Sequence, residues 1–145
     1  VFWKDVYKQS KNKISKGKLE KIYNSGISIN KPVLELAKKL KEKGLHLAIL
    51  SNESGEWMRF KIKKFQLDKV FEKIYCSAVI GIAKPIPKIF VYTLDDLGLQ
   101  ASDVLFIDNH ERNVEAARSL GIKSILFKNP KQLKEELTTQ IWQQG

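Results

Sequence analysis

Cysteine, arginine and long apolar runs are scarce in this sequence of 145 residues. The single cysteine, Cys76, excludes a disulfide framework and a thiolate metal cage, and it favours a reducing, cytoplasmic setting. The longest strong apolar run, Leu45 to Leu50, has the length of a strand, whereas a membrane-spanning helix needs roughly 20 apolar residues. No basic segment followed by an apolar one opens the chain as in a signal peptide. We therefore expect neither a membrane partner nor a secreted, disulfide-rich domain.

Arginine contributes only three of the 26 basic side chains, which face 16 acidic ones and give a net charge of +10. A basic surface attracts polyanions because binding releases counterions. Proteins that read nucleic acid usually rely on arginine forks and stacking aromatics, whereas the aromatic residues here sit mostly at helical core spacing. We interpret the charge as a lysine-rich surface with a bias toward anionic ligands, and nucleic acid is not the expected partner.

The composition, 43% hydrophobic and 29% charged, suffices for one domain with a real core. The first 30 residues have a helical pattern. A further predicted helix is capped by Asn30, has Pro32 at its start and ends at Gly44. The apolar stripes of the first segment are Phe2, Trp3, Val6 and Tyr7, followed by Leu19, Ile22 and Tyr23.

From residue 45 onward, strand patterns alternate with helical ones. The predicted strands cover residues 45–50, 74–77, 104–107 and 123–127. Helical patterns follow them, the clearest at residues 87–97 and 111–120, and the last begins at Asn129-Pro130. This alternation predicts an α/β fold with a doubly wound parallel sheet.

Polar residues mark the ends of the predicted strands. Ser51 and Asn52 follow the first strand, Lys84 lies in the loop after the second, and Asp108 and Asn109 follow the third. Parallel α/β sheets bind ligands at the carboxyl ends of their strands, so these groups are expected to gather at one edge. A hydroxyl, an ammonium group and a carboxylate there suit a phosphoryl group and Mg²⁺. Each residue taken singly also has an ordinary structural role as a turn residue, exposed lysine or helix cap.

Three segments lie in order at the ends of predicted strands. They are Leu50-Ser51-Asn52, residues 81–90 with Lys84-Pro85, and residues 105–121 with Asp108-Asn109 and Asn113. In order, spacing and placement they resemble the second, third and fourth motifs of the haloacid dehalogenase-like hydrolase superfamily. The resemblance covers residues 31–128 well, and residues 1–30 resemble the latter part of that family's helical cap. It implies a partial cap at residues 1–30 and an α/β core at residues 31–145.

The resemblance implies a Mg²⁺-dependent phosphatase that acts on a small phosphorylated metabolite through an aspartyl-phosphate intermediate. Carried over by motif, Ser51 and Lys84 are the expected catalytic residues, and Ser51 with Asn52 binds the substrate. Lys84 would hold the nucleophilic carboxylate and the transferring group. Asp108 and Asn109 are the expected metal ligands, and Asn113 would support their loop.

Departures from the family pattern qualify this expectation. The first motif, Asp-x-Asp at the end of the family's first strand, is absent, and neither Asp95-Asp96 nor Asp103 can replace it from within or just after a helix. The nucleophile is therefore expected outside this segment, on a missing N-terminal piece or a second copy, and the segment alone is expected to be inactive. That piece would also supply the strand between residues 45–50 and 104–107. Asn109 stands where many relatives carry Asp, and Ile86 replaces a common acidic residue.

Two other functions remain open at this point. A dehalogenase of the same fold would need no Mg²⁺, and Asn109 keeps that alternative in view. A non-catalytic, basic protein that binds a polyanion would explain both the net charge of +10 and the absent nucleophile.

Overall fold

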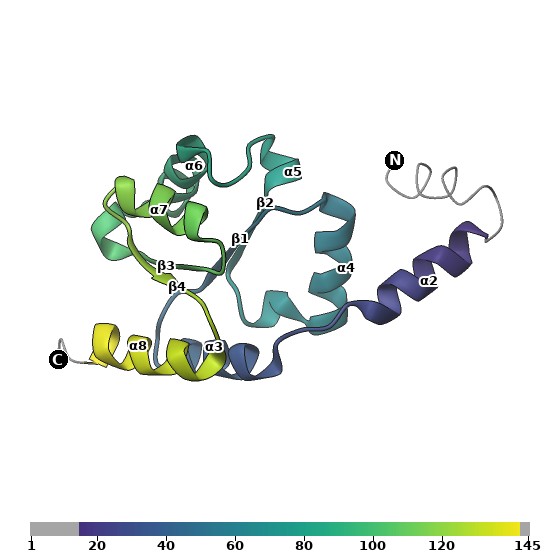
Figure 1. The fold of residues 1–145 in the computed structure, drawn as a ribbon, viewed down its shortest axis with the longest axis horizontal. Helices are drawn as coiled ribbons and strands as arrows, with labels where there is room; N and C mark the ends of the chain where they lie inside the picture. The colour runs from purple at the N-terminus through teal and green to yellow at the C-terminus, as the bar shows by residue number, and fades with distance from the viewer. Residues whose placement is uncertain (1–14, 143–145) are drawn as a thin grey trace. The chain divides into compact units, whose positions relative to one another are not determined.

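The computed structural model describes residues 15–142 of the chain (Figure 1). The chain divides into two compact units, residues 1–31 and 32–145, which are described separately. In the first, α2 (Lys16–Gly26) begins after Ser15, whose side chain accepts a hydrogen bond from the backbone N–H of Lys18. Ile22, expected on an apolar stripe, is 55% exposed. The predicted stripe of Phe2, Trp3, Val6 and Tyr7 lies outside the described residues.

The second unit alternates strands with helices from residue 48 onward, as the sequence predicted. The strands are β1 (Ala48–Ser51), β2 (Lys73–Cys76), β3 (Leu105–Asp108) and β4 (Lys123–Leu126). The helices are α3 (Lys31–Glu42), α4 (Gly55–Phe65), α5 (Ser77–Ile80), α6 (Pro87–Leu97), α7 (Glu111–Ser119) and α8 (Pro130–Trp142), with short 3₁₀ turns η1 (Leu67–Lys69) and η2 (Ala101–Asp103).

The strands form two parallel pairs. In the first pair Ser51 of β1 lies opposite Cys76 of β2, and in the second Asp108 of β3 lies opposite Leu126 of β4. Within residues 15–142, β1 has no ladder with β3, so the pairs form two separate two-stranded sheets. The edge of β1 opposite β2 and the edge of β3 opposite β4 therefore carry backbone groups without strand partners.

Helices cover both faces of the strands, which confirms the α/β class. One cluster joins Leu40 of α3, Ile125 of β4 and Leu137 of α8, and the other joins Ile89 of α6 to Ala117 of α7. Leu105 packs on the first cluster and Phe106 on the second, because successive side chains of a strand point to opposite faces. Figure 1 shows α3 and α8 on one side of the strands and α6 and α7 on the other.

The first strand is shorter than predicted. Leu45 and Leu47 pack on the α3–α8 cluster before the ladder begins at Ala48, so their hydrophobicity reflects core packing rather than strand pairing. His46 precedes the strand and does not belong to the core. Its side chain is 84% exposed and contacts Glu72, with 2.8 Å between Nδ1 and Oε2.

The described residues 15–142 include no helix with the length and hydrophobicity that crossing a membrane requires.

Candidate active site

Lys84 joins the carboxyl ends of β1 and β3. Its Nζ donates to the carbonyl oxygen of Leu50 and to Oδ2 of Asp108, both at 2.6 Å. The two side chains are 8% and 6% exposed, so their ion pair is shielded from water. The Phe106 ring lies beneath the ammonium group at 5.4 Å from its centroid. Since lysine has three donors, one N–H remains for a ligand beyond these two acceptors.

Asn52 connects the loop after β1 to the loop that carries Lys84. Its Nδ2 donates to the Lys84 carbonyl oxygen at 2.7 Å, and its Oδ1 accepts from the Lys84 backbone N–H at 2.8 Å. Both polar atoms of the amide are thus used on the backbone of one residue. Asn52, predicted to bind substrate, therefore holds Lys84 in place with its side-chain amide.

Asp108 is held on both carboxylate oxygens. Besides the bond from Lys84, its Oδ1 accepts from the His110 backbone N–H at 2.8 Å and from Asn113 Nδ2 at 3.1 Å. Burial favours the neutral acid, but the hydrogen bonds from Lys84, His110 and Asn113 and the charge of Lys84 outweigh it. They lower the pKa of the Asp108 carboxyl, which stays ionised at neutral pH.

The remaining predicted residues lie at the same edge. Ser51 ends β1, directly after the carbonyl that Lys84 contacts, and its side chain is half-buried. Asn109 is exposed, and its Oδ1 lies 3.0 Å from Nδ1 of His110. The structure thus brings Lys84, Asp108 and Asn52 into one network, with Ser51 and Asn109 beside it.

Two contributors could not be identified from residue types. The Leu50 carbonyl is a backbone group, and the Phe106 ring belongs to an apolar run that reads as core. Their only sequence signal is position within the two motifs, since Leu50 directly precedes Ser51 and Phe106 lies two residues before Asp108.

The donor atoms at this edge fit a magnesium ion in part. Asp108 and Asn109 supply hard oxygens, and three of the roughly four acceptor positions of the Asp108 carboxylate are taken, which leaves one. Oδ1 of Asn113, next to Asp108, is buried and has no hydrogen-bond partner among the described residues, so a cation-bound water could donate to it. Residues 15–142 hold no group of three or more His, Cys, Asp or Glu that could bind a metal unaided, so a further ligand would have to complete the shell.

Curated relatives match the chain over part of their length. Rat bifunctional epoxide hydrolase 2 is 31% identical over 117 residues, which span 76% of this chain and 21% of that protein. (S)-2-haloacid dehalogenase 4A of Burkholderia cepacia is 30% identical over 63% of this chain and 39% of its own. D-ribitol-5-phosphate phosphatase of Bacteroides thetaiotaomicron is 28% identical over 66% of this chain and 50% of that protein. The chain therefore spans half or less of these relatives.

A solved structure and a family model agree with the fold described above. The HAD family enzyme of Bacteroides thetaiotaomicron, in complex with magnesium and inorganic phosphate, superimposes with a TM-score of 0.74 and 29% identity over 85% of this chain and 65% of that one. The model of the haloacid dehalogenase-like hydrolases matches residues 3–127. By this match, and by the three motifs that meet at Lys84, the chain belongs to the haloacid dehalogenase-like hydrolase family.

Proposed function

We propose that this chain forms most of the core of a Mg²⁺-dependent phosphatase for a small phosphorylated metabolite. The observation that carries the proposal is Lys84, whose ammonium group bridges the ends of β1 and β3 while keeping one N–H for a ligand. A fixed cation at a strand end is suited to a phosphoryl group, since phosphoryl transfer depends mainly on positioning and charge stabilisation. The D-ribitol-5-phosphate phosphatase of Bacteroides thetaiotaomicron, which the chain matches over half of that protein's length, supports the same reaction class.

The site residues of this chain would each have a distinct role in the reaction. The Ser51 hydroxyl at the end of β1 donates a hydrogen bond to a phosphoryl oxygen, and Lys84 neutralises a second one. Asp108 holds the Lys84 ammonium group in place, and with Asn109 it would hold the metal. Bound there, Mg²⁺ would stabilise negative charge on the phosphoryl oxygens.

The nucleophilic carboxylate would come from a strand outside these 145 residues. We propose that this strand lies between β1 and β3, whose facing edges have no ladder with each other among the described residues. A parallel strand in that position would end beside Lys84, at the edge where the other two strands end. A longer parent polypeptide would supply it, either within one chain or from a second copy of that longer polypeptide. The proposed cap, residues 1–30, would then select the substrate.

The test is hydrolysis of p-nitrophenyl phosphate by the natural polypeptide that contains these residues, identified first by intact mass. We expect turnover that requires Mg²⁺ and that falls roughly 10²- to 10³-fold in Ser51→Ala, as for the loss of one donor to a transition-state oxyanion. Ser102→Ala, in η2 and exposed, is the matched control and should retain full activity. The segment of residues 1–145 alone should be inactive.

Two results would replace this proposal by the alternatives. Release of halide from a 2-haloacid without Mg²⁺ would indicate a dehalogenase, the function that Asn109 leaves open. Absence of any hydrolysis, together with nucleic-acid binding that weakens steeply with salt, would indicate a polyanion-binding protein.

A further inference from the structure

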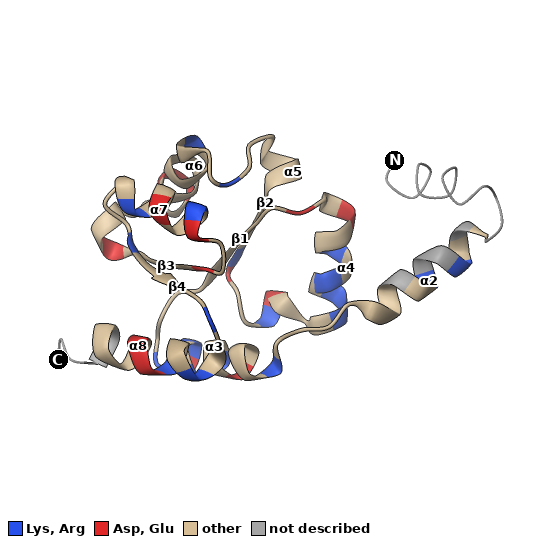
Figure 2. Ribbon diagram, viewed as in Figure 1, with Lys and Arg blue, Asp and Glu red and all other residues tan. Residues whose placement is uncertain are grey.

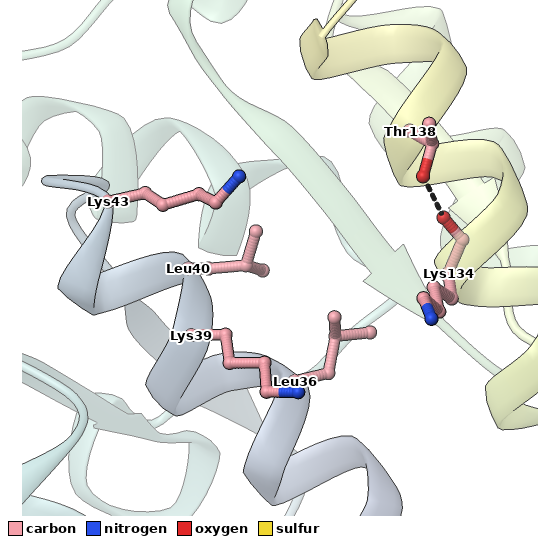
Figure 3. A pocket seen from close by; sticks show the side chains of 6 residues that line it. All are labelled: Leu36, Lys39, Leu40, Lys43, Lys134 and Thr138. Carbon is pink, nitrogen blue, oxygen red and sulfur yellow. Dashed lines mark hydrogen bonds between the residues drawn. The ribbon is translucent and has the colours of Figure 1, made fainter.

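A cavity of about 310 Å³ lies between α3 and α8 (Figure 3). This volume is at the lower end of the roughly 300–1,000 Å³ that small-molecule sites occupy. The cavity is separate from the candidate active site, because its α3 residues lie in the turns that lead into the amino end of β1, whereas Ser51 ends β1 at its carboxyl end. The residues that line it are Leu36, Lys39, Leu40, Lys43, Lys134 and Thr138.

The lining combines an apolar floor with a basic rim. Leu36 and Leu40 are one helical turn apart. Leu40 is buried in the core cluster between α3 and α8, and Leu36 is partly buried and packs against that cluster. Lys39 of α3 and Lys43 in the turn after it also line the cavity, and Figure 3 shows Lys134 on the facing helix. Lysine side chains have apolar stems below their charged ends, so the cavity is apolar at depth and cationic at its mouth.

The charges around the cavity are unbalanced. Half of the six lining residues are lysines, and none is acidic. In residues 15–142 the ammonium groups of Lys39 and Lys134 have no ion pair, whereas the neighbouring Lys38 pairs with Glu35 at 2.7 Å. Like charges around one small cavity repel each other, and a bound anion would relieve this repulsion.

We propose that the cavity binds a small amphiphile with a carboxylate or phosphate head group and a short alkyl chain. The head group would pair with Lys39 and Lys134 at the rim, and the alkyl chain would lie along Leu36, because Leu40 is only 7% exposed. An inorganic anion would leave the apolar surface of the cavity exposed to water, and a neutral amphiphile would supply no counter-charge to Lys39 and Lys134. The opposite side of α8 would repel the same ligand, because Glu135 and Glu136 lie there.

The experiment is an NMR titration of the ¹⁵N-labelled natural polypeptide that contains these residues, with octanoate and with octyl phosphate below their micelle concentrations. Both should bind with dissociation constants below about 1 mM and shift the amide signals of residues 36–43 and 134–138. Comparing the two probes identifies the preferred head group. Acetate and octanol, which lack the chain and the charge respectively, should each bind at least about tenfold more weakly.

A matched pair of variants on α8 tests the location. Thr138 lines the cavity and Thr139 lies on the side of Glu135, and both threonines are exposed. Thr138→Glu places a carboxylate at the cationic rim and should weaken octanoate binding about tenfold or more, whereas Thr139→Glu should change it less than about twofold. Lys134→Gln and Lys131→Gln form a second pair, of which only the first should weaken binding, since Lys131 does not line the cavity.

The proposal is overturned if neither probe binds in this range, if octanol binds as well as octanoate, or if both members of a pair behave alike. Because the titration requires no turnover, its outcome is independent of the proposed phosphatase activity.

Discussion

At the residue scale, Lys84 and Asp108 form a buried ion pair with further partners on each side. Burying two charges costs several kcal/mol per ion, and good geometry with additional hydrogen bonds is needed to offset that cost. The Leu50 carbonyl and the Phe106 ring contact the ammonium group of Lys84. The His110 backbone N–H and the Asn113 amide donate hydrogen bonds to the Asp108 carboxylate. Lys84 and Asp108 thus each have further partners in addition to the ion pair that joins them.

This geometry predicts an acidic shift for Asp108. The pKa of its carboxyl should lie below the ordinary value of about 3.9 when followed by ¹³C NMR, because the partners of the ionised form outweigh burial. Since the folded-state pKa is lowered, Asp108 contributes stability above pH 4 or so, and that contribution is lost as the pH falls through the folded-state value. Asn113→Ala removes one donor and should raise the pKa.

The control for this measurement is Asn109→Ala. Asn109 is the same residue type in the same loop, but its side chain contacts His110 rather than Asp108, so the pKa should not move. An ordinary or raised pKa in the unmodified chain, or equal effects of the two alanine variants, would contradict the assignment.

At the scale of elements, the site is an arrangement of loops held together by side chains. Ser54 caps α4 through the backbone N–H of Trp57, which orients the helix that follows the Ser51-Asn52 loop. The same loop is tied to the start of α5, because the Glu53 backbone N–H donates to the Ser77 hydroxyl at 3.1 Å. Asn52 adds the link to the Lys84 loop, so the segments after β1 and β2 cannot move independently.

Asn52 is therefore expected to stabilise the second unit. Asn52→Ala leaves the Lys84 backbone N–H and carbonyl without their partners and should lower the free energy of unfolding by about 1–3 kcal/mol in urea. Asn109→Ala removes an exposed contact and should change it by less than about 0.5 kcal/mol. Similar changes in the free energy of unfolding for the two variants would show that the link between the loops does not stabilise the protein.

At the scale of the whole molecule, the second unit has two cores and the chain has an uneven charge. The α3–α8 cluster and the α6–α7 cluster lie on opposite faces of the strands. Basic and acidic side chains balance from residue 74 to the end, so the entire net charge of +10 resides in residues 1–73. In the second unit this excess falls on α3 and α4, where Figure 2 shows Lys and Arg along both helices.

The two cores should contribute independently to stability. Ile89 and Ile125 are fully buried in different clusters, and replacing either by Val should cost about 0.5–1.5 kcal/mol. The double variant should cost the sum within about 0.5 kcal/mol, because the sites share no packing partner among the residues of the two clusters. Val79→Ala, at a side chain 75% exposed, is the control and should have little effect. If the stability loss of the double variant in urea unfolding differs strongly from the sum of the two single losses, the two clusters form one coupled core.

Much of this architecture follows from local patterns. Pro87 and Gly98 bound α6 as predicted, because proline suits a first helical position and Gly98 adopts a left-handed φ of 67°. The strands near Ile74, Val104 and Lys123 were found within one residue of their starts, since short apolar runs between turns are typical of buried parallel strands. The four-residue helix α5 has no such pattern, and the sequence instead predicts the end of a strand and a loop there.

By itself, the sequence determined the α/β class, the family motifs and the edge at which Ser51, Lys84 and Asp108 gather, because strand periodicity and the topology of parallel sheets are local and general rules. Only the tertiary structure decided that the Asn52 amide is used on the Lys84 backbone, that Lys84 reaches the Leu50 carbonyl, and that β1 and β3 form separate pairs among the described residues. It likewise brought Lys39 and Lys134, which are far apart in the sequence, to one cavity. These outcomes depend on which side chains meet in space, and residue types alone do not specify those contacts.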